Sequence, residues 1–215
     1  MAPSAALPQP LRDGYARFRA GRYVTDSQRY RELAVAGQRP TTLLVACSDS
    51  RSAPEAVFDA GPGELFVVRN VAGLVPVYAP DAAAHAASAA LEYGVLALEV
   101  GSIVVMGHGR CGGIAAALDG AAPLSTTDFL GAWVAGLREL AEDPEVAGVT
   151  DPAARRLALE HRSVERSLEH LRTFPWVRAR EDTGELQLHG AWFDIGLGEL
   201  HELVDGSWRQ VAGDG

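Results

Sequence analysis

The stretch TTLLVACSDSR, residues 41–51, joins a short apolar run to a polar loop. The apolar part is partly β-branched and only a few residues long, which predicts a buried strand that ends near residue 46. In the loop that follows, Cys47, Asp49 and Arg51 occupy alternate positions. The chain has 2 cysteines, so one of them stands beside an acid and a base at the end of this strand.

Similar apolar runs recur along the chain, with helical segments between them. Two further buried strands are predicted at residues 64–70 (ELFVVRN) and 102–107 (SIVVMG). Helices are expected at residues 53–60, 81–98, 114–118, 127–143 and 151–173. Strands that alternate with helices indicate a mostly parallel sheet whose two faces are both covered.

The two ends of the chain complete the predicted fold. Helices at residues 11–21 and 26–40 would form an N-terminal arm, and residues 185–204 alternate around a glycine-containing turn as a hairpin does. We therefore predict an α/β fold: a mostly parallel β-sheet flanked by helices, with an N-terminal helical arm and a C-terminal antiparallel edge hairpin. The 215 residues suffice for one domain over residues 1–215. Its expected parts are the arm (1–38), a core that carries the site (41–120), and the helices with the closing hairpin (121–205).

Composition limits the possible partners. The formal net charge of -9 argues against nucleic acid, because phosphate binding needs clustered Lys and Arg. No run approaches the roughly 18 apolar residues of a membrane span, and residues 1–21 have prolines and polar residues where a secretory signal needs a continuous apolar stretch. We expect a cytoplasmic protein with no nucleic-acid or membrane partner. In a reducing compartment, Cys47 and Cys111 are expected to bind metal or take part in catalysis rather than form a disulfide.

A second polar loop, GHGRCGG at residues 107–113, follows the strand predicted at 102–107. In a mostly parallel sheet, ligands bind outside the carboxyl ends of the strands, so this loop is expected to meet CSDSR at one edge. His108 and Cys111 lie three residues apart on a turn that enters a helix, which places their side chains on the same side. Alone the H-x-x-C spacing is weak evidence, but its position opposite Cys47 strengthens it.

Cys47, His108 and Cys111 together offer two thiolates and one imidazole, a set that suits tetrahedral zinc. Three protein ligands leave one position open, which is typical of a catalytic site, although a closed structural zinc site stays an alternative. Asp49 could fill the fourth position or accept a hydrogen bond from a bound water. Arg51 favours the second role, because a bidentate partner draws the carboxylate away from the metal. Purely structural roles, a buried cysteine and a surface ion pair, are the remaining alternative.

Three segments, CSDSR, FVVRNVAG and GHGRCGG, resemble the signature segments of the β-class carbonic anhydrases, in the same order. The similarity extends from about Tyr15 to the C-terminal hairpin. The resemblance implies reversible hydration of carbon dioxide to bicarbonate and a proton, with zinc on Cys47, His108 and Cys111 and with Asp49 and Arg51 as a catalytic dyad. It also implies an obligate dimer, often doubled to a tetramer, in which the N-terminal helices embrace the partner.

The substrate site and two alternative functions complete the sequence-based hypotheses. Carbon dioxide needs a small apolar pocket, for which Phe66, Val71 and Leu91 are candidates. Backbone N–H groups of Gly112 and Gly113, at a helix start, could favour the bicarbonate anion. The same catalytic residues could instead hydrolyse carbonyl sulfide or carbon disulfide, or the site could be a zinc- or anion-binding sensor without turnover. An acid–base pair beside the metal argues against the sensor, which needs no activated water.

Overall fold

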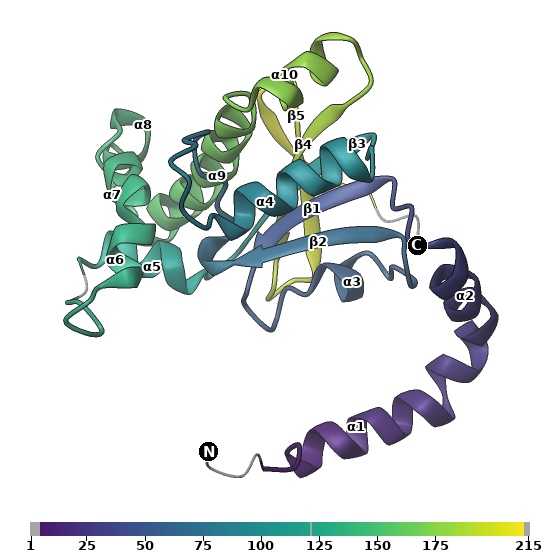
Figure 1. Ribbon diagram of the computed structural model, residues 1–215. Coiled ribbons are helices and arrows are strands. Elements are labelled where there is room, and N and C mark those ends of the chain that lie inside the picture. Colours follow the sequence, from purple (N-terminus) through teal and green to yellow (C-terminus); the bar gives the residue numbers. More distant parts are fainter. Residues whose placement is uncertain (1–4, 121, 213–215) are drawn as a thin grey trace.

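The computed structural model describes residues 5–120 and 122–212; residues 1–4, 121 and 213–215, which fall within the predicted arm, the predicted third segment and the C-terminus, lie outside the described residues. Its centre is a six-stranded sheet in the order β2-β1-β3-β4-β5-β6 (Figure 1). The strands are β1 (Thr42–Cys47), β2 (Leu65–Asn70), β3 (Ser102–His108), β4 (Gln187–Asp194), β5 (Glu199–Val204) and β6 (Ser207–Gln210). The first four pair in parallel and the last two antiparallel, which confirms the predicted α/β fold with an antiparallel edge.

Helices cover this sheet and extend from it. They are α1 (Gln9–Ala20), α2 (Arg22–Ala36), α3 (Pro54–Val57), α4 (Ala86–Glu92), α5 (Gly112–Leu118), α6 (Phe129–Trp133), α7 (Ala135–Ala141), α8 (Pro144–Ala147), α9 (Pro152–Leu171) and α10 (Pro175–Asp182). The short helical turns η1 (Val71–Gly73) and η2 (Tyr93–Ala97) follow β2 and α4. In Figure 1, α4, α9 and α10 lie on one face of the sheet and α3 on the other, whereas α1 and α2 form an arm that reaches away from the body.

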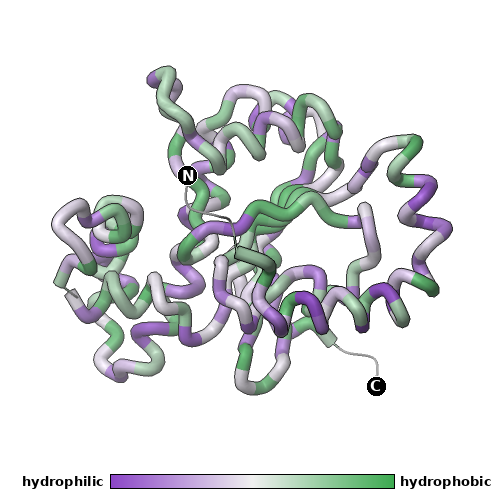
Figure 2. The backbone as a smooth tube through the Cα atoms, turned by 60° about the horizontal axis from the view of Figure 1, so that its bottom comes forward, coloured by the Kyte–Doolittle hydropathy of each residue, from purple (hydrophilic) through white to green (hydrophobic). Residues whose placement is uncertain are grey.

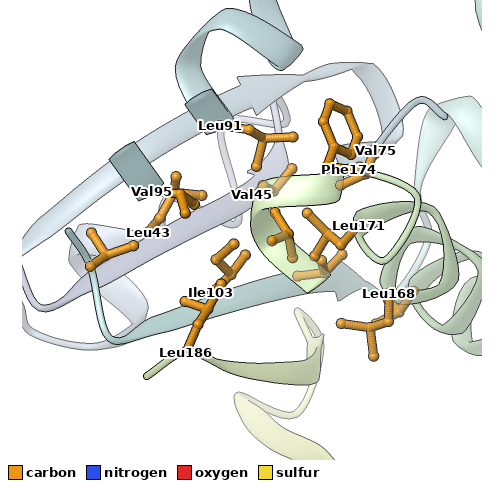
Figure 3. Close-up of a cluster of buried hydrophobic side chains, with 14 residues drawn as sticks. Leu43, Val45, Val75, Leu91, Val95, Ile103, Leu168, Leu171, Phe174 and Leu186 are labelled. Atoms are coloured by element: carbon orange, nitrogen blue, oxygen red, sulfur yellow. The ribbon is translucent and has the colours of Figure 1, made fainter. Parts of the chain in front are cut away.

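The core lies on both faces of the parallel strands. Leu43 and Val45 of β1 pack with Leu91 of α4 and Leu171 of α9 in the larger cluster (Figure 3). The intervening residues of β1 face the opposite cluster, which Val57 of α3 helps to cover. Because both faces are buried, β1 reads as one continuous apolar run instead of an alternating one. The strands at the centre of the molecule accordingly form its most continuous hydrophobic stretch (Figure 2).

Several boundaries differ from the sequence-based prediction. The helix predicted from residue 81 begins at Ala86, after Ala82 adopts a left-handed conformation with φ 64, and it ends in the wider turn of η2. The helix predicted at 127–143 divides at Val134, whose ψ of 8 is not helical. Helix α10 and strand β6 were not predicted, so the closing hairpin is a three-stranded antiparallel unit.

Candidate active site

The parallel pairing of β1 and β3 brings the two polar loops together. Ala46 is in register with Met106, so both strands end at the same edge of the sheet. Cys47 is the last residue of β1, His108 is the last residue of β3, and Cys111 immediately precedes α5. One potential ligand atom of each of these residues lies within 4.8 Å of the others. All three side chains are buried, with exposed fractions of 2–6%.

A close backbone approach supports this end of β1. Gly73 adopts a left-handed conformation, with φ 65, and passes directly over the strand. A Cβ atom on Gly73 would lie 3.0 Å from the carbonyl carbon of Ala46 and 3.0 Å from the amide nitrogen of Cys47. Such a contact is tighter than nine in ten that real Cβ atoms make, and the positive φ also disfavours any residue with a Cβ, so this position favours glycine. The segment that follows β2 therefore packs against the backbone at the end of β1, where Cys47 lies.

The orientation of His108 leaves one ring nitrogen free for a metal. Its Nδ1 lies 2.9 Å from the carbonyl oxygen of Gly109, which can only accept, so Nδ1 carries the hydrogen. Nε2 then presents a lone pair, is buried, and has no hydrogen-bond partner in the described part of the chain. In metal-binding histidines, the N–H of the second ring nitrogen commonly donates a hydrogen bond to such a carbonyl oxygen, which fixes the orientation of the ring.

The two thiols behave as a coupled pair. The pKa of Cys47 is lowered to about 4, chiefly by the hydrogen bond from Cys111 and also by His108. The pKa of Cys111 is raised, because the neighbouring Cys47 and burial both oppose a second negative charge. Each sulfur therefore disfavours a second negative charge beside it. A dication would stabilise both thiolates, and two sulfurs with one imidazole nitrogen fit zinc.

Asp49 and Arg51 form a bidentate ion pair beside these residues. The guanidinium of Arg51 donates from Nε to Oδ1 at 2.9 Å and from Nη2 to Oδ2 at 2.7 Å. The backbone N–H of Arg51 donates to the same Oδ1 at 2.9 Å, so the loop and the ion pair form one unit. These hydrogen bonds from Arg51 hold the pKa of Asp49 well below its usual range. The carboxylate is therefore ionised throughout the neutral range.

Arg69 has a structural role that its sequence position did not reveal. It extends from β2 and donates from Nε to the carbonyl oxygen of Cys47 at 2.9 Å. Its Nη2 donates to the carbonyl oxygen of Asp49. The side chain thus ties down the backbone of the loop from Cys47 to Asp49, and the only sequence signal was a charged residue near the end of a buried strand.

The five residues expected at the substrate site are not all brought together. Gly113 lies against the segment after β2, where a Cβ would be 3.2 Å from Cγ1 of Val71, whereas a Cβ on Gly112 would meet nothing within 4 Å. Phe66 is half-buried on β2, packed against the larger core cluster. Leu91 is a member of that same cluster and is 1% exposed, whereas Cys47 and Cys111 belong to a different one. The structure therefore places Val71 and Gly113 next to the loops and Leu91 in the core.

Glu160 and Trp192 were missed by the sequence analysis. The Glu160 carboxylate, on α9, is 3% exposed and accepts hydrogen bonds from the Cys111 N–H at 3.4 Å and from the Trp192 indole N–H at 3.1 Å. Burial raises the pKa of Glu160, and these hydrogen bonds partly offset it. A signal was present, because Glu160 lies on the stripe of α9 that also carries the buried Ser163, Val164 and Ser167. An acid on the apolar face of a helix indicates a specific partner.

Comparisons with known proteins agree with this arrangement. A family model described as carbonic anhydrase matches residues 42–200. The carbonic anhydrase of Pseudomonas aeruginosa is 38% identical over 200 residues, which cover 93% of this chain and 89% of that protein. Beta carbonic anhydrase 5, chloroplastic, of Arabidopsis thaliana is 35% identical over 192 residues, or 86% of this chain and 61% of the plant protein. The chain belongs to the β-carbonic anhydrase family.

Solved structures of the family share the fold. The β-carbonic anhydrase CcaA superposes with a TM-score of 0.86 at 28% identity, over 96% of this chain and 92% of that one. One of two tetrameric β-carbonic anhydrases of Sordaria macrospora gives a TM-score of 0.79 at 30% identity, over 93% and 96%. Family membership makes this chain an enzyme of the carbonic anhydrase class. No helix within the described residues is long and apolar enough to cross a membrane.

Proposed function

We propose that this enzyme reversibly hydrates carbon dioxide to bicarbonate and a proton, with zinc held by Cys47, His108 and Cys111. The observation that carries the proposal is the convergence of their ligand atoms within 4.8 Å, with the buried Nε2 of His108 lacking a hydrogen-bond partner among the described residues. In a site with three protein ligands, zinc supplies Lewis acidity that makes water ionise near neutral pH. Two thiolates already balance the charge of the ion, which leaves little reason for a third anionic ligand.

Asp49 is proposed to orient water for attack on carbon dioxide. Its carboxylate stays ionised because Arg51 lowers its pKa, so it accepts a hydrogen bond and cannot donate one. Oδ1 accepts from both the guanidinium and the backbone N–H of Arg51, whereas Oδ2 accepts only from the guanidinium and keeps a further lone pair. Arg51 holds the carboxylate at a fixed angle and off the metal. Asp49 would thus hold one O–H of the water in a hydrogen bond. That O–H then points away from carbon dioxide, and a lone pair of the oxygen points toward it.

The substrate pocket is proposed to be small and apolar. Val71 follows β2 and lies against the position of Gly113, immediately beyond the loop that carries His108 and Cys111. This proximity supports Val71 and Gly113 as substrate neighbours; Phe66, Leu91 and Gly112 stay predictions for the same site. The N–H groups at the start of α5 are suited to the bicarbonate product, which is an anion.

The alternative functions have no support from the comparisons. The relatives reported above are named carbonic anhydrases, and none is named for hydrolysis of carbonyl sulfide or carbon disulfide. A sensor without turnover has no use for the bidentate Asp49–Arg51 pair. Hydration of carbon dioxide is therefore the function that the site favours.

We infer that the enzyme works as a dimer or tetramer of this chain in the cytoplasm. Helices α1 and α2 contain no buried residue, and Leu11, Tyr15 and Val24 are 61–63% exposed along the arm. Apolar side chains on an extended arm favour contact with another chain. The Sordaria macrospora relatives are described as tetrameric, and one relative is named chloroplastic, so the relatives do not fix a compartment. Light scattering of the eluted enzyme would measure its assembly.

One experiment tests the proposed activity. The purified enzyme is assayed for carbon dioxide hydration by stopped flow, as isolated, after removal of metal by a strong chelator, and after zinc is restored. We expect one zinc per chain by elemental analysis, loss of activity with the metal, and recovery on reloading. Activity that survives complete removal of the metal, or a zinc-loaded enzyme that does not hydrate carbon dioxide, would refute the proposal.

A further inference from the structure

A carboxyl group is unusual at the place that Glu160 occupies in the fold. The side chain is on the inward face of α9, 3% exposed, and it has no ion-pair partner within the described residues. Burial of a carboxylate without a cation costs several kcal/mol, so such groups persist where their hydrogen bonds serve a purpose. The carboxylate also lines a cavity of about 460 Å³ together with Arg110 and Trp192. The proposed mechanism makes no use of it.

The partners of Glu160 point to that purpose. One oxygen accepts from the backbone N–H of Cys111, a proposed metal ligand, and the other accepts from the indole of Trp192. Trp192 is on β4, next to β3 in the sheet, and it lies beside the same loop: a Cβ on Gly109 would be 3.2 Å from its ring. The carboxylate therefore bridges a rigid strand and the loop between His108 and Cys111.

The packing of α9 makes this bridge stiff. A Cβ on Gly107 would lie 2.8 Å from Cγ2 of Val164 and 3.6 Å from the carbonyl oxygen of Glu160, so helix and strand are in close contact. The carboxyl oxygens of Glu160, which is buried on this helix, therefore have little freedom to move. The amide nitrogen of Cys111 is bonded to the Cα from which the side chain extends, so holding the amide limits where the Cβ and its sulfur can lie relative to the other ligands.

We propose that Glu160 is a positioning residue of the metal site, which clamps the Cys111 amide against Trp192 and so sets the place of the Cys111 sulfur. The proposal rests on the assignment of Cys47, His108 and Cys111 as metal ligands. Glu160 touches neither substrate nor metal in this account. Substitution of Glu160 should therefore change metal affinity and the geometry of the ligands. Activity should change only as a consequence of these two effects. Hydrogen-bond partners of metal ligands typically change metal affinity about 10- to 100-fold when removed.

The test uses four full-length variants. Glu160→Ala removes both acceptors, Glu160→Gln keeps the shape but loses the charge, and Trp192→Phe removes only the indole donor. Glu169→Gln is the matched control, since Glu169 lies on the same helix with its side chain 49% exposed in surface ion pairs. Zinc affinity is measured by competition with a chelator, and ligand geometry by the visible absorption of the cobalt(II)-substituted enzymes. Thermal unfolding of the zinc-free proteins measures the structural contribution separately.

We expect zinc affinity to fall about 10- to 100-fold in Glu160→Ala and by less in Glu160→Gln and Trp192→Phe. The cobalt absorption bands should be altered in all three variants. Glu169→Gln should keep both the zinc affinity and the cobalt spectrum of the wild-type enzyme. If Glu160→Ala does not fold, the two milder variants decide. Unchanged affinity and spectra in the folded variants, with or without a lower melting temperature, would overturn the proposal and leave Glu160 a merely structural residue. Failure of the wild-type enzyme itself to bind zinc or cobalt would instead refute the ligand assignment.

Discussion

Substitution of Gly73 by alanine should damage both stability and the metal site. Two costs add. A left-handed conformation costs a residue with a Cβ about 1–2 kcal/mol relative to glycine, and Gly73 has φ 65. The new methyl group would also lie 3.0 Å from backbone atoms of Ala46 and Cys47, which cannot rotate away. Overpacking of this kind costs about 1–3 kcal/mol. We therefore expect the free energy of unfolding to fall by roughly 2–5 kcal/mol.

A matched control separates the two costs. Gly184 also has positive φ, 76, and its Cβ would meet nothing within 4 Å. Gly184→Ala should therefore lose only the conformational part, about 1–2 kcal/mol. Urea unfolding of the zinc-free proteins at one protomer concentration gives both values, and a chelator competition gives zinc affinity. Because the clash is against Cys47, Gly73→Ala should also bind zinc more weakly, whereas Gly184→Ala should not. Equal destabilisation of the two variants, with wild-type zinc affinity in both, would refute the reasoning.

Three further predictions concern the proposed ligands and the dyad. Asp49→Ala should keep its full zinc content and lose about 100- to 10,000-fold in carbon dioxide hydration measured by stopped flow; loss of zinc together with activity would instead make Asp49 a ligand. Cys47→Ser should lower zinc content on elemental analysis, and full zinc at full rate would remove Cys47 from the ligand set. Arg51 lowers the pKa of Asp49 well below its usual range, so the stability from this ionised pair is present above the unfolded pKa of about 4 and lost as pH falls through the folded value. In Arg51→Ala, the carbon-13 NMR titration of Asp49 should move up toward about 3.9; an unchanged titration would show that Arg51 does not control this carboxyl.

Much of the sheet, and the convergence of Cys47, His108 and Cys111, could be predicted because the signals are local. The apolar runs that became β1 and β3 each end in a polar loop, and parallel neighbouring strands end at the same edge. Those two facts bring Cys47 and His108 together without knowledge of any contact. The bidentate pairing of Asp49 with Arg51 likewise needs only two residues of separation.

The missed features depend on contacts between distant segments. Glu160 accepts a hydrogen bond from Cys111, which is 49 residues away in the sequence. No local sequence pattern predicts which amide a buried carboxylate will bind. The left-handed Ala82 delays the start of α4, although Ala83 and Ala84 after it have strong helix propensity. Leu91 was named only as an apolar candidate for the substrate pocket, and that role stays a prediction. The face of α4 on which it lies is set by packing against β1, which places it in the core.

The loop between the ligands links the dyad to the metal site. Arg110 adopts a left-handed conformation with φ 58, which costs a non-glycine residue about 1–2 kcal/mol. The contacts that hold it come from opposite sides: its carbonyl oxygen accepts from Nη2 of Arg51 at 3.2 Å, and the next amide, of Cys111, donates to Glu160. That turn directs Cys111 back toward His108. The guanidinium that holds Asp49 therefore also holds the peptide that precedes Cys111, so the geometry of the dyad is coupled to that of the proposed ligand set.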